Sequence, residues 1–165
     1  MRTVAVATLL CLMPACGSSD SAGAPKAVAT SSTTAEEAQA IDGPVMRYHD
    51  NSSPSGNLKN LLQGVLQLEG DCLYLSVAAI DQHFPVLWPA GTRWDAQNKS
   101  VVSPSGAVMP IGSHVEGRGG YFFLSDIHLL AGNAASNLAA ECVDRSVGQI
   151  VVVQNSASSI GPTAG

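Results

Sequence analysis

GVLQLEGDCLYLSVAA, residues 64–79, contains two short runs of alternating apolar and polar residues on either side of a turn. The apolar side chains take every second position within each run: Leu66, Leu68, Leu73, Leu75 and Val77. Alternation with a period of two is typical of a β-strand that buries one face. The stretch therefore predicts two β-strands joined by a turn at residues 69–71.

Further short apolar segments follow this pair, and turns that contain glycine or proline separate them. These segments are FPVLWPAG (84–91), SVV (100–102), AVMPIG (107–112), SHVEG (113–117), YFFL (121–124) and QIVVV (149–153). The last run suits a strand that is buried on both faces. Residues 125–142 differ, because their alanines favour helix and Ser125 or Asp126 can act as an N-cap.

The number and spacing of these segments predict the fold class. Six or seven short strands, with turn signals about every 8 to 12 residues and one or two short helical turns, indicate a mainly β fold. A small barrel or a sandwich fits this pattern. The glycine-punctuated run at 107–123 makes an OB-like barrel one option.

The overall charge argues against nucleic acid as a partner. The 165 residues include 8 basic and 13 acidic side chains, for a formal net charge of −5, and the basic residues form no cluster. The length suits one domain with tails.

The N-terminus resembles the signal sequence of bacterial lipoproteins. After Arg2, residues 3–13 form an uncharged, mostly apolar run of 11 residues, which is shorter than the roughly 20 residues that a membrane-spanning helix needs. Met13-Pro14-Ala15-Cys16 then resembles a lipobox. The resemblance implies a signal peptide at 1–15, a diacylglyceryl group on the Cys16 thiol, and fatty acylation, such as palmitate, at the new amino terminus. Two alternatives are an ordinary secretory signal and a cytoplasmic protein with an apolar start.

A lipidated Cys16 would place the chain on the extracytoplasmic face of the cell membrane or the outer membrane. The sequence then divides into a flexible Ser/Ala/Gly-rich tether at 16–57, a compact β domain at 58–155 and a disordered tail at 156–165. The order GDCLYL, PVLWPAGT, SPSG, HVEGRGGY also resembles a small exported domain of uncharacterised lipoproteins from high-GC bacteria. That resemblance implies no known activity.

Four cysteines occur, and two of them fall within the predicted domain. Cys11 leaves with the signal peptide and Cys16 carries the lipid, so Cys72 and Cys142 remain in a compartment that permits disulfides. A Cys72–Cys142 disulfide is the simplest interpretation, and two buried free thiols are the alternative. Neither cysteine belongs to a C-x-x-C pair, so the sequence predicts no metal site.

No sequence motif assigns catalytic residues or a cofactor. The histidines are scattered, and the G-x-S-x-G pattern of serine hydrolases is absent. His114 and Glu116 lie two residues apart and would share one face of a strand. The candidate ligand contacts are therefore this pair and two aromatic residues, Trp94 and Tyr121.

These observations favour a lipid-anchored cell-envelope protein that acts as a non-enzymatic binding or structural module, and they leave enzymatic activity open. An envelope hydrolase and an accessory lipoprotein subunit of a membrane complex are the alternatives. The expected partners are the membrane, through the lipid anchor, and an envelope protein or polysaccharide.

Overall fold

The computed structural model of the chain describes residues 40–49, 58, 60–144, 147–154 and 160–163. The predicted signal peptide, the lipidation site Cys16 and most of the predicted tether lie outside these residues. The helical segment that was predicted within 125–142 forms a 3₁₀ turn and a helix, η1 (Leu124–Asp126) and α2 (Ile127–Cys142).

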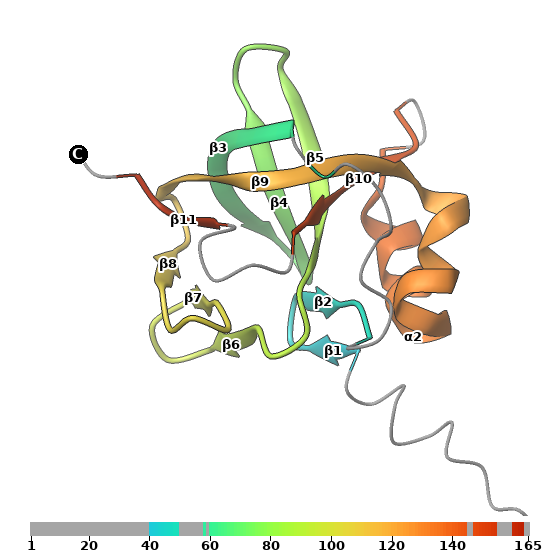
Figure 1. Cartoon of the computed structure of the whole chain (residues 1–165), viewed down its shortest axis with the longest axis horizontal. Helices are drawn as coiled ribbons and strands as arrows, with labels where there is room; N and C mark the ends of the chain where they lie inside the picture. Colours follow the sequence, from blue (N-terminus) through green and yellow to red (C-terminus); the bar gives the residue numbers. More distant parts are fainter. Residues whose placement is uncertain (1–39, 50–57, 59, 145–146, 155–159, 164–165) are drawn as a thin grey trace, which may run out of the picture. The chain divides into compact units, whose positions relative to one another are not determined.

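The described strands, drawn in Figure 1, are β1 (Ile41–Asp42), β2 (Val45–Arg47), β3 (Asn60–Glu69), β4 (Cys72–Val77), β5 (Gln82–Trp88), β6 (Arg93–Asp95), β7 (Ser100–Val102), β8 (Val108–Pro110), β9 (His114–Phe123), β10 (Gln149–Val153) and β11 (Ile160–Pro162). The predicted pair of strands within residues 64–79 is present as β3 and β4, which pair in antiparallel fashion. The described part of the chain has more short strands than the six or seven predicted, because several two- and three-residue strands lack an alternating pattern of their own.

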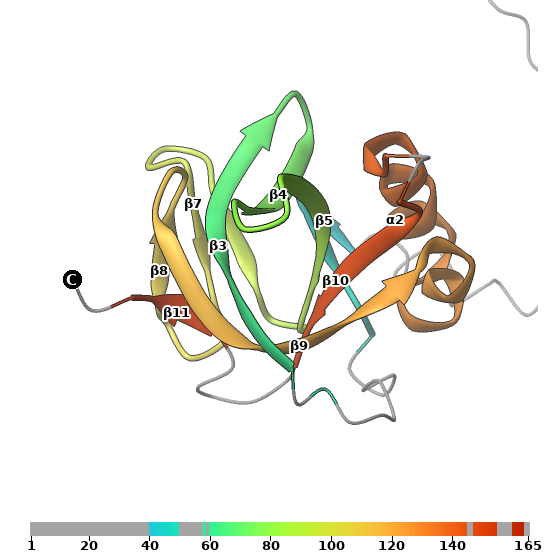
Figure 2. The ribbon, with the colours of Figure 1, turned by 90° about the horizontal axis from the view of Figure 1, so that it is seen from above.

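Five strands close into a barrel in the order β5-β10-β9-β3-β4, and β4 pairs back with β5. Figure 2 shows this ring from above. β5 and β10 are parallel neighbours, whereas the other neighbours in the ring are antiparallel. The prediction of a small, mainly β barrel is confirmed, and a five-stranded barrel is also the form that OB folds take.

β3 takes part in two sides of the barrel. Its first half, Asn60–Val65, pairs with β9, and its second half, Val65–Glu69, pairs with β4. Gly64 lies at the change of partner, where a Cβ atom would stand 2.5 Å from the carbonyl oxygen of Ser76. The absence of a side chain at residue 64 therefore allows β4 to approach β3 closely.

The core has two parts, one inside the barrel and one between the barrel and α2. Inside the barrel lie the side chains of Val45, Leu62, Leu66, Leu73, Leu75, Phe84, Val86, Trp88, Val101, Met109, Val115, Val151, Val153 and Ile160. Outside it, α2 packs against apolar side chains from β2, β5 and β10. Because Ile150–Val153 of β10 are all buried, the prediction of a strand with two buried faces is confirmed.

α2 covers this outer face with alanines. Ala131, Ala135 and Ala139 are spaced by four residues, so they lie on one side of the helix, and all are fully buried. Gly132 interrupts the helix with a φ of 74°, which favours glycine over residues with a side chain. Of the two predicted N-cap residues, Ser125 and Asp126, Asp126 occupies the position, but its side chain makes no capping hydrogen bond.

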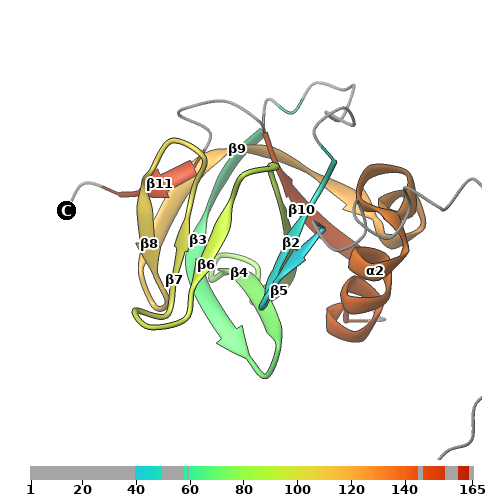
Figure 3. The ribbon, with the colours of Figure 1, turned by 90° about the horizontal axis from the view of Figure 1, so that it is seen from below.

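Strands β6, β7 and β8 form a separate three-stranded sheet on the other side of the barrel from α2 (Figure 3). Val101 and Met109 are neighbours across β7 and β8, and both side chains enter the barrel core. This small sheet therefore closes part of the barrel interior.

The folded part extends beyond the predicted domain at both sides. Val45, Met46 and Tyr48, which fall in the predicted tether, are almost fully buried, and the Tyr48 hydroxyl donates to the carbonyl oxygen of Val153 at 3.1 Å. Within the predicted tail, β11 pairs with β9, and Ile160 is only 5% exposed. Both segments hold only a few apolar residues, and those residues are buried by partners that are distant in sequence.

Candidate functional site

The predicted contact Trp94 is half-buried at the small sheet. Its ring packs against the barrel core and over Gly43, where a Cβ atom would stand 2.8 Å from the ring atom Cδ1. Its backbone N–H donates to Asp42 Oδ2 at 3.0 Å. These contacts give Trp94 a packing role between the small sheet and the turn that joins β1 to β2.

The other predicted contacts lie on β9. His114 and Glu116 are exposed, and Glu116 Oε2 accepts a hydrogen bond from Gln63 Nε2 at 2.9 Å. Tyr121 is 37% exposed, and its ring stands edge-on to that of Phe84, with 4.9 Å between the ring centroids. Because Glu116 and Tyr121 are five strand residues apart, about 16 Å separates them, and the predicted contacts form no common site.

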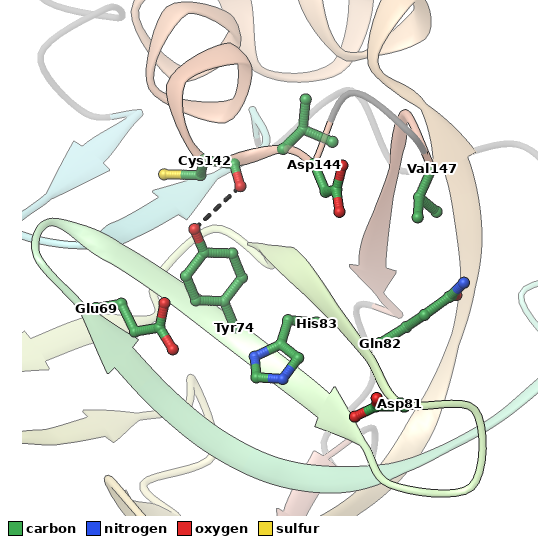
Figure 4. A pocket seen from close by; sticks show the side chains of 9 residues that line it. Glu69, Tyr74, Asp81, Gln82, His83, Cys142, Asp144 and Val147 are labelled. Atoms are coloured by element: carbon green, nitrogen blue, oxygen red, sulfur yellow. Dashed lines mark hydrogen bonds between the residues drawn. The ribbon is translucent and has the colours of Figure 1, made fainter.

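A pocket of about 390 Å³ lies elsewhere, on the outer surface of the barrel beside the end of α2 (Figure 4). One side of it, which we call the barrel-side wall, consists of Glu69, Tyr74, Asp81, Gln82 and His83. The other side, which we call the helix-side wall, consists of Cys142, Val143, Asp144 and Val147, from the connection between α2 and β10. Strands and a helix end thus meet at this pocket.

The alternation of β4 and β5 positions the barrel-side wall. Leu73, Leu75 and Phe84 point into the barrel, so Tyr74 and His83 point outward. Their rings stand edge-to-face, with centroids 6.2 Å apart and an angle of 72° between the planes. In Figure 4 the two rings lie between the carboxylates of Glu69 and Asp81.

Two interactions join the walls at Cys142. The predicted Cys72–Cys142 disulfide is present, with an S–S distance of 2.06 Å. The Tyr74 hydroxyl donates to the carbonyl oxygen of Cys142 at 3.0 Å. Burial, and to a smaller extent the negative charge of Glu69, raises the pKa of Tyr74, so the hydroxyl keeps its proton and remains a donor at neutral pH.

The described lining is acidic. It contains the carboxyl groups of Glu69 and Asp81, both on exposed residues. Carboxylates accept hydrogen bonds and attract positive charge, and the chain as a whole carries a net charge of −5. The pocket is therefore suited to a ligand with positive charge and hydrogen-bond donors.

The described residues contain no group of three or more histidine, cysteine, aspartate or glutamate side chains arranged to hold a metal ion. No helix within the same residues is long and apolar enough to span a membrane. Among the described residues that were predicted as site residues, Cys142 of the disulfide lines the pocket.

Sequence reasoning missed Tyr74 and His83 as site residues, although a signal for Tyr74 was available. Cys72 and Tyr74 share the outward face of one strand, and a Cys72–Cys142 bond brings the residues after Cys142 over that face. The carboxylates, in contrast, are spread evenly along the sequence and gather only in the folded chain.

No protein-family model, curated protein or solved structure matches this chain. The chemistry of the pocket and the N-terminal sequence are therefore the observations from which a function can be inferred.

Proposed function

We propose that the chain is a lipid-anchored envelope protein whose barrel is a non-enzymatic binding module. Its pocket would bind a positively charged ligand with several hydrogen-bond donors, such as the arginine or lysine side chains of a peptide. The observation that carries the proposal is a pocket of about 390 Å³ whose described lining combines the carboxyl groups of Glu69 and Asp81 with the rings of Tyr74 and His83.

The lining groups suit such a ligand in two ways. The carboxylates of Glu69 and Asp81 are on exposed residues at the pocket, where they can accept hydrogen bonds from a guanidinium or ammonium group. The ring of Tyr74 adds a surface that attracts cations. A polysaccharide offers hydroxyl donors but no positive charge, so it would use less of this lining.

The position of the pocket supports a binding role by analogy with other barrels. OB folds bind ligands on the face of their second and third strands and on the loops beside it. In this barrel the second and third strands are β4 and β5, which supply Tyr74 and His83. The analogy concerns the fold alone and does not identify the ligand.

The lipobox-like Cys16 supports the location. A disulfide between Cys72 and Cys142 agrees with an oxidising compartment outside the cytoplasm. We expect radiolabelled palmitate to be incorporated into the full chain and not into a Cys16→Ala variant. A Cys16→Ala chain that still carries the label would contradict the anchor.

Isothermal titration of the detergent-solubilised full chain with a tri-arginine peptide tests the binding role, with a tri-glutamate peptide and a neutral oligosaccharide as comparisons. We expect the chain to bind tri-arginine and to bind neither tri-glutamate nor the oligosaccharide. Glu69→Gln and Asp81→Asn should each weaken it about fivefold, which corresponds to an exposed ion pair of about 1 kcal/mol. The matched control is Glu116→Gln, which removes a carboxylate outside the pocket. Equal weakening by the control, or preferred binding of tri-glutamate, would contradict the proposal.

A hydrolase is the second candidate, because the pocket also brings His83 together with carboxylates. In a hydrolase, His83→Gln would abolish turnover of an envelope polymer. In a binding module it would change only the affinity for tri-arginine. Release of soluble fragments from purified cell envelopes, measured for the wild-type chain and for this variant, separates the two functions.

A further inference from the structure

We propose that the pocket is redox-sensitive: reduction of the Cys72–Cys142 disulfide by a dithiol releases the helix-side wall and weakens ligand binding. The inference rests on the binding function proposed above for the same pocket. It adds a means of regulation, which follows from the position of the disulfide rather than from the composition of the lining.

The disulfide joins the two sides of the pocket directly. Cys72 is the first residue of β4, two residues before Tyr74, and Cys142 is the last residue of α2 and part of the helix-side wall. The two cysteines are 70 residues apart in sequence. A covalent bond at this place fixes where the connection from α2 to β10 begins relative to the face of the barrel.

Backbone hydrogen bonds also hold the helix-side wall. Val143 N–H donates to the carbonyl oxygen of Ala139 at 2.8 Å, and Val147 N–H donates to that of Asp144 at 3.0 Å. Gly148, the residue after Val147, accepts a hydrogen bond from Leu124 N–H through its carbonyl oxygen at 3.1 Å. Reduction would therefore loosen the wall at its Cys142 end while the far end stays attached.

After reduction, the hydrogen bond from the Tyr74 hydroxyl would be the remaining described interaction between β4 and Cys142. The acceptor of that bond is the carbonyl oxygen of Cys142 itself, so any movement of Cys142 also moves the partner of Tyr74. Loss of the covalent bond thus affects both interactions that we described between β4 and Cys142. The Tyr74 ring, part of the proposed cation-binding surface, would lose its fixed position.

The two cysteine residues differ in exposure. The residue Cys142 is 5% exposed, whereas Cys72 is half-buried, so a reductant reaches Cys72 first. A thiolate of the dithiol attacks Cys72 Sγ, the S–S bond breaks, and Cys142 leaves as a thiolate that takes up a proton. The second thiol of the reductant then attacks the mixed disulfide and releases Cys72. Two electrons pass to the protein, which gains two thiols, and the dithiol becomes a disulfide.

Binding and hydrogen exchange of the full chain, with and without dithiothreitol, test the inference. We expect the affinity for tri-arginine to fall about tenfold on reduction, because the ligand must then order the wall as it binds. Exchange of the Val143 amide, next to Cys142, should become faster, while the far-UV circular dichroism remains that of a folded barrel. A Cys72→Ala/Cys142→Ala variant should behave like the reduced chain and should not respond to dithiothreitol.

A Tyr74→Phe variant is the matched comparison, because it keeps the disulfide and removes only the hydrogen bond to Cys142. It should retain a response to dithiothreitol, which separates the effect of the covalent bond from that of the hydroxyl. Unchanged affinity and unchanged amide exchange after reduction would overturn the inference. So would unfolding of the reduced chain, because a released wall requires a barrel that stays folded.

The same measurements separate failure of the inference from failure of the proposed function. If the oxidised chain does not bind tri-arginine, the binding function is wrong, and the amide exchange alone decides whether the disulfide controls the wall. If the oxidised chain binds tri-arginine and reduction leaves both affinity and exchange unchanged, the binding function stands and the redox control is wrong.

Discussion

Replacement of Met46 by alanine in the full chain decides whether the segment before β3 is a tether or part of the core. Met46 is 1% exposed and packs in the cluster that α2 forms with β2, β5 and β10. Truncation of a fully buried methionine to alanine costs about 2–5 kcal/mol, because apolar contacts are lost and a cavity remains. The same substitution in a solvated tether would cost nearly nothing.

Equilibrium unfolding in urea, followed by tryptophan fluorescence, measures this difference. With a slope of about 1–3 kcal/mol per molar urea for a domain of this size, the midpoint should fall by about 1–2 M. The slope itself should not change, because the same surface is exposed on unfolding. Leu61→Ala is the matched control, since Leu61 is 58% exposed on β3 and its truncation should move the midpoint little.

A midpoint for Met46→Ala within about 0.2 M of the wild-type value, with an unchanged slope, would refute this reasoning. It would mean that β2 detaches from β5 at little cost and that the compact domain begins after it. A fall equal to that of Leu61→Ala would lead to the same conclusion. The total free energy of unfolding of an ordinary domain is about 5–15 kcal/mol, and the expected loss is a large fraction of it. The two outcomes therefore differ by more than the error of the measurement.

Three further predictions concern the Cys72–Cys142 disulfide, Gly64 and the buried hydroxyl of Tyr48. Replacement of both Cys72 and Cys142 by alanine should lower the free energy of unfolding by about 4 kcal/mol, the chain-entropy value for a loop closed by residues 70 apart, as urea unfolding would measure. Gly64→Ala should cost about 1–3 kcal/mol in the same assay, because its Cβ would overlap the carbonyl oxygen of Ser76. Burial raises the pKa of Tyr48 above the ordinary value of 10.0, so its contribution to stability is complete below pH 10 and declines as the pH rises above it. Tyr48→Phe should therefore show a smaller loss of unfolding free energy between about pH 9 and 11 than the wild-type chain.

The fold could be predicted where the information is local. The alternation in residues 64–79 identifies two strands because the period of side chains along a strand is fixed. The apolar run at 149–153 identifies a strand with two buried faces for the same reason, since no polar side is left for solvent. The disulfide followed from the number of cysteines, which needs no knowledge of the fold.

The remainder depended on contacts between distant parts of the chain. Val45, Met46 and Tyr48 form no long pattern, and their burial requires the barrel and α2 to be in place. Ile160 is likewise buried only because β11 finds the free edge of β9 beyond the end of β10. A short apolar segment beside turn residues carries too little pattern to distinguish such an edge strand from a tail.

The pocket lies where the outer cover of the barrel ends. Along β5, Leu87 points outward and is buried in the cluster that includes α2, whereas His83 points outward on the same face and is exposed. α2 ends at Cys142, whose bond to Cys72 holds the end of the helix against β4. The side chains just beyond that end, Tyr74 among them, are therefore flanked by protein on one side and open to solvent on the other. The helix that buries apolar side chains of the barrel thus also forms one wall of the polar pocket at its own end.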